Sequence, residues 1–111
     1  MDLVNQLIAL QQQLTASIGK LKQNGVALAA AERDYKIALN KRVLELRDEG
    51  MAVTLIQLII YGEREIAELR FKRDVAKVVY ETNLEHINGT KLQMRILESQ
   101  INREWGSDSN I

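Results

Sequence analysis

The chain has 111 residues, enough for a single domain, and its 15 basic and 15 acidic residues give a net charge of zero. A neutral chain has no overall field that would draw it to nucleic acid or to anionic lipid. The absence of cysteine excludes disulfides, thiolate metal sites and a cysteine nucleophile. With no proline and only 5% aromatic residues, the composition is typical of long helices.

The first predicted helix covers residues 2–49. Its apolar residues recur three and four positions apart, which places them on one helical face. They are Val4, Leu7, Leu14, Ile18, Leu21, Leu28, Tyr35, Leu39 and Leu46. Asn24-Gly25 is a pair that commonly closes a helix, but the seven-residue spacing continues across it in register. We therefore predict one helix, kinked or weakened near Gly25, over the alternative of two separate helices.

Residues 50–62 are predicted to form the turn between two long helices. Gly50 ends the first helix, and Thr54 is a candidate N-cap for a short helix over residues 55–61 that Gly62 terminates. The apolar run from Met51 to Tyr61 holds about eleven residues, whereas a bilayer-spanning helix needs ~20.

A short helix this apolar cannot face water on all sides, and two interpretations remain open. The segment either plugs the end of the hairpin or serves as a docking surface, because clustered Leu, Ile and Tyr make good interface anchors. For the docking surface, the predicted partner contacts are Leu55, Ile56, Ile59, Ile60 and Tyr61.

The second long helix is predicted over residues 63–104, where Glu63 and Glu65 suit the dipole of its first turn. Its apolar face consists of Ile66, Leu69, Ala76, Tyr80, Ile87, Met94, Leu97 and Ile101. Two helices of similar length predict an all-α fold, a long antiparallel hairpin over residues 1–105 with a short helix at its tip. Residues 106–111 are predicted to be a disordered tail.

Both long helices also carry apolar residues outside these faces. They are Leu3, Ile8, Leu10 and Val43 on the first helix, and Phe71, Val75, Val78, Val79, Leu84 and Ile96 on the second. A two-helix hairpin cannot bury them all, and the simplest remedy is self-association into a dimeric four-helix bundle. The rival remedy is packing against a different protein.

The reactive side chains form no convergent set. His86 is the only histidine, and no second histidine or cysteine can share a metal ion with it. No nucleophile elbow, phosphate loop or dinucleotide fingerprint occurs in the sequence. We expect a protein without enzymatic activity, without catalytic residues and without a cofactor, a metal or a small-molecule substrate.

Basic residues cluster on either side of the predicted turn, where a hairpin would bring them together. They are Lys41, Arg42, Arg70, Lys72, Arg73 and Lys77. Such a patch can contact phosphates, so nucleic-acid binding is an alternative function. Acidic residues such as Glu68 and Asp74 interleave with the patch, however, and this favours a solvated surface of mixed charge.

Four stretches of the chain resemble small, uncharacterised coiled-coil proteins of phages and prophages in Gram-positive bacteria. These are residues 31–39 (AERDYKIAL), 46–54 (LRDEGMAVT), 69–76 (LRFKRDVA) and 95–105 (RILESQINREW). The resemblance implies an accessory role near replication and recombination genes, in the host cytoplasm. It supplies no catalytic residues.

The expected function is therefore a protein–protein interaction module that binds a replication or recombination protein or inhibits a host enzyme. A structural or assembly component of a virion is a further alternative. The absence of a secretion signal or a membrane span agrees with a cytoplasmic location.

Overall fold

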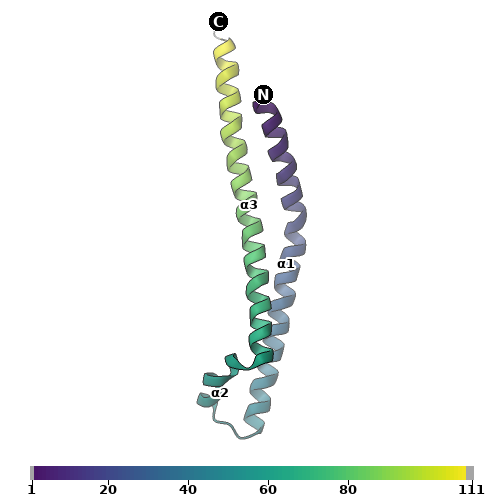
Figure 1. The fold of residues 1–111 in the computed structure, drawn as a ribbon, viewed down its shortest axis with the longest axis vertical. Coiled ribbons are helices and arrows are strands. Elements are labelled where there is room, and N and C mark those ends of the chain that lie inside the picture. The colour runs from purple at the N-terminus through teal and green to yellow at the C-terminus, as the bar shows by residue number, and fades with distance from the viewer. Residues whose placement is uncertain (1, 110–111) are drawn as a thin grey trace. The chain divides into compact units, whose positions relative to one another are not determined.

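The computed structural model describes the backbone of residues 2–109 and the side chains of residues 2–106. Two long helices, α1 (Leu3–Asp48) and α3 (Arg64–Ser109), are joined through the short helix α2 (Val53–Ile59) and the 3-10 helix η1 (Ile60–Gly62), as Figure 1 shows. No strand occurs within residues 2–109. The predicted all-α helical hairpin with a short helix in its turn is confirmed.

The chain divides into two units that both helices help to build. The first unit comprises Met1–Gln23 and Glu81–Ile111, and the second comprises Asn24–Tyr80. Each unit therefore combines part of α1 with part of α3, and the second also contains α2 and η1.

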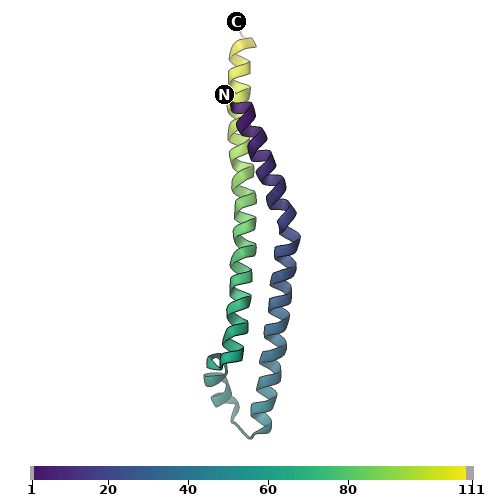
Figure 2. The same ribbon diagram turned by 45° about the vertical axis from the view of Figure 1, so that its right-hand side comes forward.

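The second unit contains a compact apolar core close to the turn. Its buried members are Tyr35, Leu46, Ile56, Ile60 and Ile66. Partly buried side chains of α1, of α3 and of the turn surround them, namely Ala38, Leu39, Val43, Met51 and Leu69. In Figures 1 and 2, α2 lies beside the start of α3. The core explains this position, because α2 and η1 each contribute one fully buried isoleucine.

The first unit has a more polar interior. Ile87 is buried, but so are Ser17 and Thr90. The Asn83 side-chain amide donates a hydrogen bond of 3.0 Å to the backbone carbonyl of Ser17, which links α3 to α1. The Thr90 hydroxyl donates to the carbonyl of His86, one turn earlier. Hydrogen bonding therefore offsets the cost of placing these polar groups in the helix–helix interface.

Gly25 lies inside α1, which continues through it without a break. The alternative of two separate helices is therefore wrong. A Cβ atom at Gly25 would lie 3.3 Å from Cε1 of Tyr80. The missing side chain thus leaves room for the Tyr80 ring against the backbone of α1, and this packing is a physical reason for a glycine at this position.

Gly50 ends α1 as predicted, through a Schellman motif. Its φ of 88° lies in the left-handed region, which glycine adopts without steric cost. The Gly50 amide donates to the carbonyl of Arg47, and the Met51 amide donates to that of Leu46. Met51 also packs against the core that contains Leu46, which supplies the apolar contact that accompanies such a cap.

The boundaries of the other helices differ from the predicted ones. α2 begins at Val53 rather than at residue 55, and its N-cap is Ala52, which makes no side-chain capping bond. Thr54 is therefore not the N-cap but a residue of the helix. α3 continues to Ser109 instead of ending at residue 104. Residues 106–109 of the predicted disordered tail are thus helical, and residues 110–111 lie outside the described part of the chain.

The predicted face of α3 is buried or half-buried at all eight positions, but two positions predicted for the face of α1 are wrong. Val4 and Ile18 are exposed, and Ser17 is buried in the interface that Ile18 was expected to fill. The inward positions of α1 in the first unit are Leu3, Leu7, Leu10, Leu14, Ser17 and Leu21. Their spacing alternates strictly between four and three residues, a heptad seam that includes a serine.

Candidate functional site

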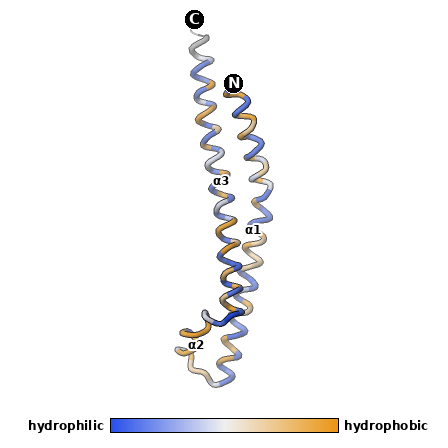
Figure 3. The backbone as a smooth tube through the Cα atoms, in the orientation of Figure 1, coloured by the Kyte–Doolittle hydropathy of each residue, from blue (hydrophilic) through white to orange (hydrophobic). Residues whose placement is uncertain are grey.

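The segment formed by α2 and η1, residues 53–62, is the candidate interaction site, and we call it the tip segment. Figure 3 shows it as strongly hydrophobic, and it contains no charged residue. Two of its isoleucines, Ile56 and Ile60, are only 2% exposed and belong to the core of the second unit. The tip segment is therefore fixed to that unit by two buried anchors four residues apart, on one face of the helix.

The burial of these isoleucines corrects part of the predicted contact set. Ile56 and Ile60 were predicted to touch a partner, but they have almost no surface to offer. Leu55, Ile59 and Tyr61 remain exposed, as that prediction requires. The two interpretations of this segment, a plug of the hairpin end and a docking surface, are thus compatible. The buried face with Ile56 and Ile60 forms the plug, and the opposite face is free to contact a partner.

Leu58 is the most exposed large apolar side chain among residues 2–106, at 81%, and the predicted contact set omitted it. Its position follows from helical geometry, because residue 58 lies about 200° around the helix from residue 56 and from residue 60. Once Ile56 and Ile60 are recognised as the inward pair, Leu58 must point outward. The spacing in the sequence is therefore enough to predict that Leu58 is exposed, but only once the structure shows which face of the helix is buried.

A shallow groove of about 230 Å³ lies along the tip segment, between α1 and α2. The α1 side chains Leu39, Val43 and Arg47 line one part of it, and residues of the tip segment line the rest: Val53, Ile56, Gln57, Ile60 and Tyr61. The guanidinium of Arg70 lies 5.4 Å from the centre of the Tyr61 ring, within the range of a cation–π contact. This contact helps to hold an exposed aromatic side chain beside the groove.

The predicted nucleic-acid patch loses three of its six basic groups to contacts within the second unit. Arg42 donates to both carboxylate oxygens of Glu63, at 2.7 and 2.9 Å, and also to Glu45. Arg73 donates to Asp74 and lies over the ring of Tyr35. Arg70 lies over Tyr61, as described above.

The remaining basic residues of the patch, Lys41, Lys72 and Lys77, are exposed. Acidic partners therefore neutralise part of the patch, in agreement with a surface of mixed charge.

The Arg42–Glu63 pair also changes the ionisation of both groups. The hydrogen bonds from Arg42 lower the pKa of Glu63 below its ordinary value. The hydrogen bonds that Arg42 donates to Glu63 and Glu45 also raise the pKa of Arg42 itself. The pair joins α1 to the residue just before α3 and so fixes where the second long helix starts.

Two further properties concern the described residues as a whole. Residues 2–106, whose side chains are described, contain no group of three or more His, Cys, Asp or Glu side chains arranged to hold a metal ion. Within the same range, no helix has an apolar stretch long enough to cross a membrane.

Comparison of the chain with protein-family models, with curated proteins and with solved structures finds no match.

Proposed function

We propose that this chain is a non-enzymatic protein–protein interaction module and that the tip segment is its contact surface. The supporting observation is Leu58, 81% exposed on a helix that two buried isoleucines hold in place. Exposing a large apolar side chain to water is unfavourable, and covering it with a partner lowers the free energy of the complex. Leu55, Ile59 and Tyr61 extend the same apolar surface.

The anchoring of the tip segment favours binding. A surface that is already ordered loses little conformational entropy when a partner docks, and more of the contact energy remains as affinity. The segment also carries no charge that would have to be desolvated in an interface. These properties fit a preformed apolar anchor for another protein.

The partner class comes from the sequence resemblance to phage and prophage proteins. It is a replication or recombination protein, or a host enzyme that the chain inhibits, in the bacterial cytoplasm. Nucleic-acid binding and a structural role in a virion are the alternatives from the sequence, and no observation on the fold favours either.

The test is a substitution at the most exposed position of the tip segment. Leu58→Asp places a charge where we expect a partner to exclude water, and we expect capture of the partner to fall by a factor of about ten or more. Leu44→Asp is the matched control, since it makes the same substitution at an exposed leucine of α1, outside the tip segment. The measurement is a quantitative pulldown with each tagged variant from cells that produce the chain.

Circular dichroism shows whether both variants keep the helical fold. If the folded Leu58→Asp variant captures every protein that the wild type and the Leu44→Asp control capture, in the same amounts, the tip segment is not the contact surface.

A further inference from the structure

In the second unit, α3 presents an apolar surface that belongs to this helix alone. Phe71 is 65% exposed, and Val75, Val78 and Val79 are exposed beside it. Together with Asp74 they line a shallow, almost wholly apolar depression on α3. These residues are distinct from the inward positions of the same stretch, which are Ile66, Leu69, Arg73, Ala76 and Tyr80.

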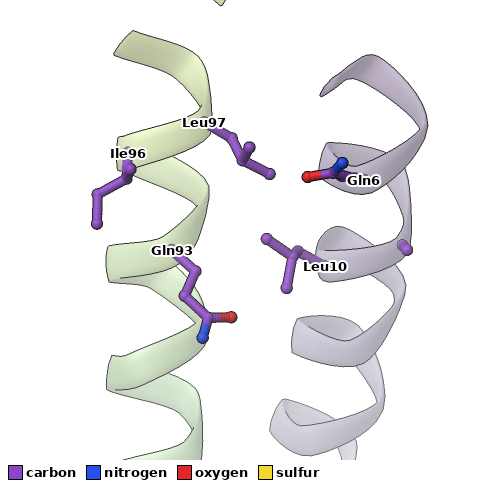
Figure 4. Close-up of a pocket in the computed structure, with 6 residues that line it drawn as sticks. Gln6, Leu10, Gln93, Ile96 and Leu97 are labelled. Atoms are coloured by element: carbon purple, nitrogen blue, oxygen red, sulfur yellow. The ribbon is translucent and has the colours of Figure 1, made fainter. Parts of the chain in front are cut away.

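In the first unit, α3 again exposes apolar residues away from its seam. Leu92 is 55% exposed and Ile96 is 52% exposed. Figure 4 shows that the Ile96 side chain points away from α1, whereas Leu97 points towards Leu10 of α1. Leu92 and Ile96 are therefore exposed outside the buried seam, although Ile96 also borders an open pocket that Gln6, Ala9 and Leu10 of α1 line.

These two surfaces have the same spacing of apolar and charged residues, but their charged residues have opposite signs. Phe71, Asp74 and Val75 form the first, which we call the acidic patch, and Leu92, Arg95 and Ile96 form the second, which we call the basic patch. Each residue of the basic patch follows its counterpart in the acidic patch by 21 positions, Leu92 after Phe71, Arg95 after Asp74 and Ile96 after Val75. Both patches therefore have apolar residues at positions i and i+4 of a helix and a charged residue at i+3.

We propose that the acidic patch of one copy of the chain packs against the basic patch of a second copy, with the two α3 helices antiparallel. In this register Phe71 lies opposite Ile96 of the second copy, and Val75 lies opposite Leu92. The charged residues flank this apolar seam, and in antiparallel coiled coils equivalent flanking positions face each other. Asp74 of one copy thus meets Arg95 of the other.

The charges select this pairing over the competing ones. Packing two acidic patches would place Asp74 beside Asp74, and packing two basic patches would place Arg95 beside Arg95, and both bring like charges together. A parallel pair offset by the same 21 residues leaves Asp74 and Arg95 on opposite sides of the seam. Only the antiparallel contact between unlike patches joins apolar residues and opposite charges at once.

Both charged groups are accessible for such a contact. The Asp74 side chain is 55% exposed, and the N–H groups of Arg73 that reach it are directed at one oxygen, Oδ1. Arg95 is exposed and makes no ion pair within the described part of the chain. The contact uses no residue of the tip segment, so it goes beyond the proposed function and does not depend on it.

Charge reversal in single and mixed variants tests the pairing. Asp74→Arg alone or Arg95→Asp alone places like charges at the contact, and we expect the dissociation constant for self-association to rise by about tenfold or more. In an equimolar mixture of the two variants, every contact between unlike copies again joins opposite charges. We expect the mixture to associate as tightly as the wild type, as measured by sedimentation equilibrium.

Matched controls separate the contact from a general effect of charge. Asp34→Arg is the control for Asp74→Arg, because Asp34 is equally exposed and pairs with the preceding Arg33 in the same way. Arg103→Asp is the control for Arg95→Asp, at another exposed position of α3. We expect both controls to associate like the wild type.

Three results would overturn the proposal. They are a wild-type chain that remains monomeric up to millimolar concentration, single variants that associate as tightly as the controls, and a mixture that fails to recover association. Recovery in the mixture would also show that both variants are folded.

The chain has no cysteine, so introduced cysteines report orientation directly. We expect Phe71→Cys and Ile96→Cys chains, when mixed and oxidised, to form the disulfide between unlike chains in preference to either like pair. A preference for like pairs would contradict the antiparallel register.

Discussion

At the scale of single residues, the ion pair between Arg42 and Glu63 differs in geometry from the others described. It is bidentate and half-buried, and it joins residues 21 positions apart in the chain. Arg33–Asp34 and Arg73–Asp74 instead join neighbours, and Asp34 and Asp74 have largely exposed side chains. Exposed pairs contribute little to stability, whereas a two-point guanidinium–carboxylate contact fixes geometry as well as charge. The start of α3 therefore depends on Glu63 more than on other surface carboxylates.

The loss of stability on replacing the Glu63 carboxylate should depend on pH. The pKa of Glu63 is lower in the folded chain than in the unfolded one, so its stabilising effect is complete above the unfolded pKa of about 4.3 and is lost as pH falls through the folded pKa. We expect Glu63→Gln to melt at a lower temperature than the wild type at pH 7. The difference should shrink as the pH falls from the unfolded pKa through the lower folded pKa, where the wild-type carboxylate becomes protonated.

Thermal unfolding followed by circular dichroism between pH 7 and pH 2 measures this difference. Glu65→Gln is the control, since Glu65 is an exposed carboxylate in the first turn of α3 and makes no ion pair among the described residues. A loss of stability at Glu63 that is independent of pH, or equal to the loss at Glu65, would contradict the assigned role.

At the scale of elements, α1 contains two interior glycines with different surroundings. Nothing lies within 4 Å of a Cβ placed on Gly19, whereas a Cβ on Gly25 would meet the Tyr80 ring at 3.3 Å. Both glycines lower the intrinsic helix propensity of α1 by a similar amount. Only at Gly25 does a packing contact offset the lower helix propensity, because the missing side chain lets the Tyr80 ring of α3 approach the backbone of α1.

The two glycines should therefore respond differently to alanine. We expect Gly19→Ala to stabilise the chain by roughly 0.5–1 kcal/mol, since it gains helix propensity without a new contact. We expect Gly25→Ala to stabilise the chain by less than Gly19→Ala, or to destabilise it, because the Tyr80 ring must move. Chemical denaturation provides both free energies of unfolding.

A double substitution isolates the cause of this difference. In a Tyr80→Ala background, Gly25→Ala should recover most of the gain seen at Gly19, because the ring is no longer present. Equal gains for Gly19→Ala and Gly25→Ala in the otherwise wild-type chain would show that the Tyr80 contact does not constrain this position.

At the scale of the whole molecule, apolar residues exceed what a hairpin can cover. Among residues 2–106, eighteen large hydrophobic residues are exposed, whereas six hydrophobic residues are buried. Scattered exposed apolar residues are normal on proteins, but those of the tip segment and of the patches on α3 are clustered. Such clusters fit a chain that works in an assembly, with separate surfaces for a protein partner and for a second copy.

Self-association should be visible in the stability of the chain. If two copies associate only when folded, the melting temperature rises with protein concentration. We expect a rise across a roughly hundredfold range of wild-type concentration and a much smaller one for Asp74→Arg, which weakens the proposed contact. Differential scanning calorimetry measures both. A wild-type melting temperature that does not change with concentration would argue against a folded dimer.

Much of the fold could be predicted from the sequence, because helical periodicity is a local property of the chain. The face of α3 from Ile66 to Ile101, the glycine end of α1 and the short helix in the turn were all predicted. So was the exposure of Phe71, Val75 and Val78 outside the seam. Leu3, Leu10 and Val43, which were expected outside the faces in the same way, are instead half-buried. The function and the partner remain proposals, because periodicity describes which surface is apolar and not what covers it.

The sequence by itself determined that this chain forms two long helices with a short apolar helix between them, because the spacing of apolar residues and the glycine positions act within a few residues of each other. Only the tertiary structure decided which side chains are inside. It buried Ser17 in place of Ile18, and it turned Ile56 and Ile60 inward while Leu58 faces out. The physical reason is that burial depends on the register between two helices, and residues far apart in the chain set that register together.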